Sequence, residues 1–316
     1  MNPAPRLKLD RAAVARLVDD LAPGSTLSTI RSLRGGARRR VFNVRWRDAA
    51  GVHRRIVVRL APERGGVEEN ARAEFQTLSA LHAAGLPVPR PLLVDAEHEY
   101  FDHPAIVMEY AGRPVVNPRD RDAWLRRCAE TLADLHGPSA MAADLSHLRT
   151  SSLDERRAYQ EASLTPEHLS QFETDELIGR ATEALARAQE NQKPVHPRLV
   201  HDDYWPGNIL WRRDRLSAVI DWTEATLSDP ARDVAQFQID MALMSGLEDA
   251  QEFGRLYSAA AGGEPENLRY VQLYGIRSAY AHLEDWYLPG YLDLGMKLTL
   301  SMLQVRFRDY IRWVLE

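Results

Sequence analysis

The chain contains very little cysteine, because Cys128 is the only one among its 316 residues. An intramolecular disulfide and a metal site built from several cysteines are therefore both excluded. Trp124, Cys128 and Leu132 follow each other at helical spacing, which places the thiol on the apolar face of a predicted helix. We expect Cys128 to be a buried structural residue.

The sequence also lacks any hydrophobic run long enough to cross a membrane, and residues 1–6 lack the apolar core of a signal peptide. We therefore expect no membrane partner and a cytoplasmic location. Basic residues are not in excess, since 40 Lys and Arg against 45 Asp and Glu give a net charge of −5. This balance argues against a nucleic-acid partner. Nothing in the sequence indicates an oligomeric state.

Polar residues that proteins seldom bury without a function are concentrated between residues 201 and 221. His201, Asp203 and Asn208 lie between two apolar runs, and a third apolar run leads to Asp221. A β-hairpin that turns near residues 212–215 would return Asn208 and Asp221 to the same end of a sheet. Carboxylate and amide oxygens are the ligands that Mg²⁺ prefers, and a spare carboxylate can accept a proton from a hydroxyl. The pattern predicts a Mg²⁺ site with a base beside it.

The order His201-x-Asp203-x-x-x-x-Asn208, followed by Asp221, resembles the catalytic core of the aminoglycoside phosphotransferase and choline kinase-like family, which is related to the protein kinases. This resemblance implies ATP- and Mg²⁺-dependent phosphorylation of a small-molecule hydroxyl, with GTP as an alternative donor. It implies that Asp203 is the catalytic base and that Asn208 and Asp221 bind Mg²⁺. Turn residues that cap backbone amides are the structural alternative for Asp203 and Asn208.

The neighbours of these residues are assigned supporting functions. We expect the His201 ring to bond the backbone and shape the loop, since a His–Asp phosphohydrolase would need further histidines that the sequence does not place together. Asp202, which stands where the family usually has a small residue, is either a bystander or a substrate contact. Asp229 is predicted to cap a helix and Asp233 to lie in its first turn, where the resemblance implies that it braces the loop.

The first 111 residues are predicted to form a nucleotide-binding lobe with five strands. Gly35 and Gly36 lie at a turn that can approach a phosphate closely, and the strand at 56–60 offers Arg59 where the family has a phosphate-binding lysine. Glu74, on a helix predicted over 68–84, is expected to pair with Arg59. By resemblance, backbone groups near Glu109 and Ala111 bind the adenine.

The predicted fold is therefore α+β, two-lobed and protein-kinase-like. Residues 1–111 would form a small antiparallel sheet with one helix, and residues 112–316 a larger, mainly helical lobe with the catalytic loop. A further short amphipathic helix is expected over residues 10–22, and other helices are expected from Asn117-Pro118, over 268–287 and over 291–315.

The acceptor is the least defined part of the prediction. The family binds it between the catalytic loop and the C-terminal helices, where Glu284 and Asp285 stand among aromatic residues. With Trp205, and with Trp222 as a further candidate, these side chains favour a cationic, ring-shaped acceptor such as an aminoglycoside. A macrolide, a choline-like amine or a sugar stays open, as does a nucleotide-binding pseudokinase, for which the only support is Arg59 in place of lysine.

Overall fold

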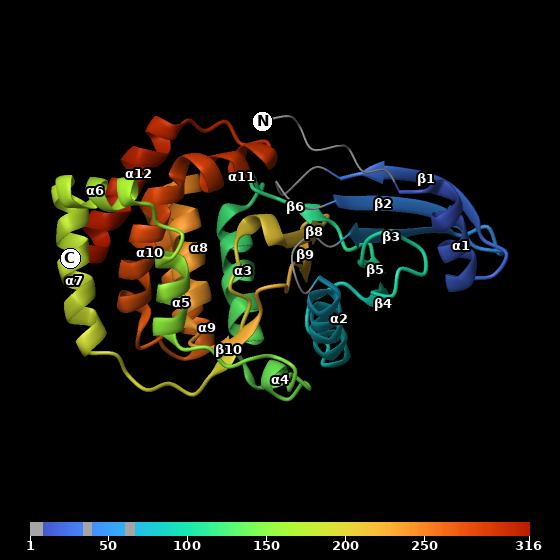
Figure 1. Ribbon diagram of the computed structural model, residues 1–316, viewed down its shortest axis with the longest axis horizontal. Helices are drawn as coiled ribbons and strands as arrows, with labels where there is room; N and C mark the ends of the chain where they lie inside the picture. Colours follow the sequence, from blue (N-terminus) through green and yellow to red (C-terminus); the bar gives the residue numbers. More distant parts are fainter. Residues whose placement is uncertain (1–8, 34–39, 61–66) are drawn as a thin grey trace.

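The computed structural model describes residues 9–33, 40–60 and 67–316 of the chain. A lobe built on an antiparallel sheet is followed by a mainly helical lobe, as the α+β kinase-like prediction requires (Figure 1). The expected glycine turn at Gly35 and Gly36 lies outside the described residues. Within the three described ranges, no helix combines the length and the apolar character needed to cross a membrane.

The first lobe is organised around a five-stranded antiparallel sheet with strand order β1-β2-β3-β5-β4. Its strands are β1 (Thr26–Ser32), β2 (Arg40–Arg47), β3 (His53–Leu60), β4 (Pro91–Asp95) and β5 (Ala105–Glu109). The two helices of this lobe are α1 (Arg11–Leu21) and α2 (Val67–Ala83), close to the ranges predicted from periodicity.

Alternation along β3 explains which side chains face the rest of the molecule. Ile56, Val58 and Leu60 are buried in one apolar cluster with the inward face of α1. Because successive side chains of a strand point to opposite faces, Arg59 projects from the other face of the sheet. On that second face, Ile106 of β5 belongs to an apolar core that also includes residues of α2 and of the helical lobe. Arg59 is therefore directed to the junction of the two lobes.

The second lobe surrounds a central helix, α8, that is buried along its length apart from Gln236. Its helices are α3 (Arg121–Leu135), α4 (Pro138–Met141), α5 (Leu153–Glu161), α6 (Pro166–Thr174), α7 (Glu176–Glu190), α8 (Ala231–Met244), α9 (Leu247–Ala261), α10 (Leu268–His282), α11 (Leu288–Asp293) and α12 (Leu300–Leu315). Its short strands are β6 (Arg113–Pro114), β7 (Arg198–Val200), β8 (Ile209–Arg212), β9 (Arg215–Val219) and β10 (Thr226–Ser228).

Three helix boundaries differ from the prediction. Helix α3 begins at Arg121 rather than beside Asn117, because the side chain of Asp120 accepts the hydrogen bond from the Ala123 N–H. The helix expected over 268–287 is α10, which ends at His282 and continues as a π-helical turn over Leu283–Tyr287. The helix expected over 291–315 is interrupted, since Gly295 adopts a left-handed conformation with φ of 83° and α12 starts only at Leu300.

Candidate active site

The predicted hairpin is present and brings the two polar segments together. Strands β8 and β9 pair antiparallel with Ile209 opposite Val219. One step beyond that pair, the Ile220 N–H donates to the Asn208 carbonyl at 3.0 Å. Asn208, at the end of a short 3₁₀ turn, and Asp221 therefore lie at the same end of the hairpin, as the sequence predicted.

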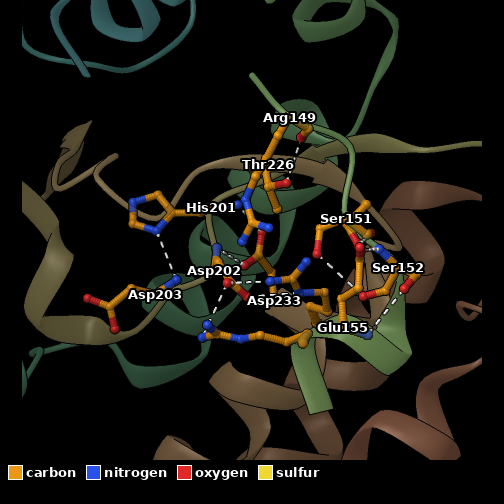
Figure 2. A network of polar contacts seen from close by, with 12 residues as sticks. Arg149, Ser151, Ser152, Glu155, His201, Asp202, Asp203, Thr226 and Asp233 are labelled. Atoms are coloured by element: carbon orange, nitrogen blue, oxygen red, sulfur yellow. Dashed lines mark hydrogen bonds and ion pairs between the residues drawn. The ribbon is translucent and has the colours of Figure 1, made fainter. Parts of the chain in front are cut away.

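His201 shapes the loop through both ring nitrogens. Nε2 lies 2.9 Å from the Ile220 carbonyl oxygen, which can only accept, so Nε2 carries a proton. Nδ1 accepts from the Asp203 N–H at 3.2 Å (Figure 2). The ring also stands against Trp222, with centroids 4.5 Å apart. These contacts bear out the predicted bonding of the His201 ring to the backbone, whereas Trp222 is buried here and does not line the cavity described below.

Asp233 holds the same loop from beneath, at the start of α8 (Figure 2). Its two oxygens accept from the backbone N–H groups of His201 and Asp202, each at 2.7 Å, and Oδ2 also lies 3.1 Å from His136 Nε2. Burial alone would raise the pKa of Asp233, but the His136 contact and the His201 N–H together hold that pKa below its usual range. Nearby, Asp229 accepts from the Ala231 N–H at 2.8 Å at the start of α8, although the N-cap residue is Pro230 rather than the predicted Asp229.

Asn208 fixes the loop residue that is proposed as the base. Its Nδ2 donates to the Asp203 carbonyl oxygen at 2.9 Å and to Asp203 Oδ2 at 2.8 Å. Since the amide nitrogen is used in this way, the amide oxygen is the atom of Asn208 with which a metal ion would be bound.

Asp221 stands on the other side of this small volume, in the left-handed region with φ of 74°. Its Oδ1 lies 3.0 Å from the Thr223 hydroxyl and 3.7 Å from Arg59 Nη1. One carboxylate and one amide oxygen suit Mg²⁺, which usually combines one or two protein ligands with water and substrate phosphates. Within the described ranges no group of three or more His, Cys, Asp or Glu side chains is arranged to hold a metal ion.

The predicted ion pair between Arg59 and Glu74 is present. Glu74 is buried on α2, and its Oε2 also lies 3.1 Å from the Thr223 hydroxyl. Arg59 Nη1 in turn lies 3.5 Å from that hydroxyl. Thr223, which sequence reasoning missed, therefore joins the nucleotide-lobe pair to Asp221.

The segment predicted to bind adenine connects the lobes between β5 and β6. The Glu109 N–H donates to the Arg90 carbonyl at 2.9 Å. The Ala111 carbonyl accepts from the Ser217 hydroxyl on β9, which fastens the segment to the β8–β9 hairpin. Close contact continues at Gly112, where an added Cβ would lie 2.5 Å from the Trp211 carbonyl oxygen. The segment is thereby held against the hairpin that carries Asn208 and Asp221.

Asp203 also lines a cavity of about 630 Å³ in the helical lobe. Aromatic side chains form much of its wall, among them Trp205, Trp286 and Tyr287. Glu284 and Asp285, which the sequence suggested as acceptor ligands, do not line it, because the π-helical turn leaves both side chains exposed and Asp285 contacts His282 instead. Trp205 lines the cavity, as do Trp286 and Tyr287, two of the aromatic residues beside Glu284 and Asp285.

The cavity contains a carboxylate that the sequence did not single out, Asp240 of α8. Its Oδ1 accepts from the Tyr291 hydroxyl at 2.7 Å, and its Oδ2 accepts from Gln236 Nε2 at 2.7 Å. Burial raises the pKa of Asp240 to about 7, the two hydrogen bonds oppose this rise, and the charge of Asp203 adds to it. Only the fold brings α8, α11 and the catalytic loop together, so no local sequence signal marks this residue.

Gly207 sets the position of Trp205, and its replacement by alanine tests the importance of that wall. A Cβ at Gly207 would stand 2.2 Å from the Trp205 indole, so the ring must move. We expect Gly207→Ala to raise the KM for the acceptor by about 10-fold, which is less than the roughly 100-fold that a 1 Å misplacement of positioning groups can cost. Nucleotide affinity should stay unchanged. Gly179→Ala on α7, where a Cβ meets nothing within 4 Å, is the matched control; an unchanged acceptor KM in Gly207→Ala would contradict the assignment of Trp205.

Comparison with known proteins places this site in a family. The family model described as the phosphotransferase enzyme family matches residues 29–273. Among curated relatives, acyl-CoA dehydrogenase family member 11 of Homo sapiens is 27% identical over 178 residues, which cover 52% of this chain and 22% of that protein. The uncharacterized protein YcbJ of Bacillus subtilis is 28% identical over 199 residues, 56% of this chain and 60% of YcbJ. Hygromycin-B 4-O-kinase of Escherichia coli is 29% identical over 87 residues, 28% of this chain and 26% of the kinase.

Solved structures share the fold over nearly the whole chain. Macrolide 2'-phosphotransferase MphH from Brachybacterium faecium superposes with a TM-score of 0.58 at 23% identity, covering 91% of this chain and 99% of that one. Spectinomycin phosphotransferase, solved with ADP and spectinomycin, gives 0.63 at 15% identity, covering 96% and 100%. This chain spans about a fifth of the length of the acyl-CoA dehydrogenase relatives. Since the family model covers more than half of its residues, the chain belongs to the phosphotransferase enzyme family, a family of small-molecule kinases.

Proposed function

We propose that this protein transfers a phosphoryl group from ATP, in the presence of Mg²⁺, to a hydroxyl of a small organic acceptor. One observation carries the proposal: Asp203, Asn208 and Asp221 converge beside the Arg59–Glu74 pair on one side and a cavity for an acceptor on the other. ATP as the donor is supported by solved relatives that contain ADP or AMP-PNP.

Each lobe has its own part in this proposal. The lobe up to residue 111 would hold the nucleotide, with Arg59 on the phosphates and backbone groups of Glu109 and Ala111 on the base. Gly35 and Gly36 are proposed to approach the phosphates. The lobe from residue 112 would supply the catalytic loop and the acceptor site. Mg²⁺ at Asn208 and Asp221 would neutralise charge on the phosphates.

Asp203 is proposed as the general base because it lines the acceptor cavity and its orientation is fixed. Hydrogen bonds from Asn208, together with the His201 ring, hold its backbone and one carboxylate oxygen. A hydroxyl placed against the other oxygen would lose its proton to Asp203 as the phosphoryl group transfers. Positioning of this kind accounts for most of the catalysis expected in phosphoryl transfer.

The aminoglycoside acceptor favoured by the sequence is supported by the kinase relative that acts on hygromycin B and by Asp240 in the cavity. A macrolide, a choline-like amine or a sugar is the alternative acceptor under the same proposal. The substitution of Arg59 for lysine is weak support for the pseudokinase alternative, since the arginine makes the ion pair with Glu74 that was expected of it.

We expect ADP release from ATP to require Mg²⁺, to increase with one acceptor class, and to stop when EDTA is added. Asp221→Asn should raise the Mg²⁺ concentration for half-maximal rate by at least about 10- to 100-fold, the loss seen when groups that merely orient metal ligands are removed. Asp214→Asn, in the exposed hairpin turn, is the control for lost charge. Nucleotide binding without ADP release for any acceptor would favour the pseudokinase, and faster turnover with GTP would change the donor.

A further inference from the structure

Two arginines and one carboxylate form a charged cluster on the wall of the acceptor cavity, next to Asp203. Arg232 of α8 holds Asp202 with a forked contact, with its Nε 2.9 Å from Oδ1 and its Nη2 on Oδ2. Arg156 of α5 approaches the same Oδ2 with its Nη2 at 3.2 Å. All three residues line the cavity. Figure 2 shows the Asp202 carboxylate with dashed lines to the side chains that contact it.

This cluster holds more positive than negative charge. Both guanidinium groups stay protonated, whereas Asp202 supplies one negative charge at most. Asp233 lies close by but does not line the cavity, and its oxygens are already engaged by two backbone N–H groups and His136. Glu224 also attracts Arg156 electrostatically, but the Glu224 side chain is exposed, so water and salt screen this attraction. Within the cluster one positive charge is therefore left over, while Asp203 and Asp240 supply the other carboxylates of the cavity wall.

The charged groups of this cluster are largely buried, and the charge of Arg156 is not placed where it would stabilise its helix. The Arg156 side chain is 16% exposed, and those of Asp202 and Arg232 are 6% and 2% exposed. Arg156 stands at the fourth position of α5, where a cation opposes the helix dipole. Among the residues that the structure describes, Nη1 of Arg232 has no hydrogen-bond partner. A buried guanidinium in this state is stabilised when an anion joins it.

We propose that Arg156 and Arg232 form a subsite for an anionic group, a carboxylate or a phosphate, carried by the same acceptor whose hydroxyl meets Asp203. The inference rests on the proposed kinase function and defines its substrate class. Guanidinium groups bind both kinds of anion through paired N–H donors. Tyr274 on the same cavity wall adds a neutral O–H donor, because burial raises its pKa and keeps the phenol protonated.

The arrangement also limits the shape of the acceptor. Asp202 and Asp203 are neighbours in the chain, but the Asp203 carboxylate points away from the Asp202 network (Figure 2). The anionic group and the reacting hydroxyl must therefore be separated by a spacer, and the aromatic wall with Trp205 and Trp286 favours an apolar one. An acid of this kind is an alternative to the polycationic aminoglycoside, whose amines the two arginines would repel.

Calorimetry with three matched ligands tests the subsite independently of turnover: hydroxymethylbenzoate, hydroxymethylphenyl phosphate and hydroxymethylbenzamide. We expect the wild-type protein to bind one or both anions about 10- to 100-fold more tightly than the neutral amide, the usual range for hydrogen bonds to charged groups. Arg156→Gln should abolish this preference, and Arg156→Lys should restore part of it. The tighter of the two anions identifies the group as carboxylate or phosphate.

Arg157→Gln is the matched control, since it removes the same charge at the next residue of α5. The Arg157 side chain bonds Gln189 and does not line the cavity. Equal binding of the three ligands by the wild type, or an anion preference that survives in Arg156→Gln, overturns the subsite. ADP release with the same ligands separates the two proposals. Tighter binding of the anions without any ADP release would support the subsite and contradict the kinase function. ADP release with cationic or neutral acceptors that is unaffected in Arg156→Gln would support the kinase function and contradict the subsite.

Discussion

Asp203→Asn is expected to lower kcat by about 100- to 10,000-fold, the usual contribution of a positioned general base. The amide has nearly the same shape as the carboxylate, but it cannot accept the proton of the acceptor hydroxyl. Steady-state measurements of ADP release would check the fall in kcat, and calorimetry would determine the nucleotide affinity. Nucleotide affinity should be retained, because Asp203 lies in the helical lobe and contacts Asn208 rather than the Arg59–Glu74 pair.

The structure indicates why this variant should keep its loop. The Asp203 N–H still donates to His201 Nδ1, and the Asp203 carbonyl still accepts from Asn208 Nδ2. An amide oxygen at position 203 can also replace Oδ2 as the acceptor for Asn208. Asp214→Asn provides the control for a lost surface carboxylate. A kcat in Asp203→Asn equal to that of the wild type would show that another group accepts the proton.

Most parts of the site that the sequence predicted depend on short stretches of chain. Alternation along β3 is enough to direct Arg59 away from the core around Val58, and the apolar runs on either side of residues 212–215 are enough to define a hairpin. The spacing from His201 to Asn208 then specifies the loop. The structure agrees with the sequence on these features because each follows from local geometry rather than from the packing of distant helices.

The proposed acceptor site was not predictable in the same way. Arg156, Asp240 and Tyr291 meet the catalytic loop from three helices, α5, α8 and α11, and each has an ordinary amphipathic context in the sequence. Glu284 and Asp285 were chosen for their charge and their aromatic neighbours, but a π-helical turn changes which side chains face inward. The acidic and aromatic residues of this segment therefore suggested a cationic acceptor, whereas packing places two arginines on the cavity wall.

Local capping rules also explain the displaced helix boundaries. Asn117-Pro118 and Asp120 are competing start signals, and the structure uses Asp120, whose side chain reaches an N–H of the first turn. Periodicity carried the last predicted helix through Gly295, because Met296 and Leu300 fit its apolar stripe. The left-handed glycine breaks that helix, and Thr299 then caps α12.

Asp233→Asn is expected to lower the free energy of unfolding by about 2–4 kcal/mol, because one buried N–H group loses its acceptor and a buried charge network is disrupted. The N–H groups of His201 and Asp202 bond to different oxygens of Asp233. An amide has only one acceptor oxygen, so one of the two N–H groups would face an NH₂ group instead. Urea unfolding would measure the loss, and kcat should fall with it because the same loop carries Asp203. Asp144→Asn, at an exposed residue whose side chain bonds Ser146 two positions along the chain, should change neither.

The pH dependence separates this effect from a simple packing defect. The pKa of Asp233 is lower in the folded protein than its ordinary value, so its stabilising contribution is fully present above the pKa of an unfolded aspartate, about 3.9. That contribution is lost as the pH falls through the lower, folded-state value. The difference in free energy of unfolding between wild type and Asp233→Asn should therefore be constant from neutral pH down to about 4 and shrink below it. A difference that stays the same in acid would mean that the carboxylate charge does not hold the catalytic loop in place.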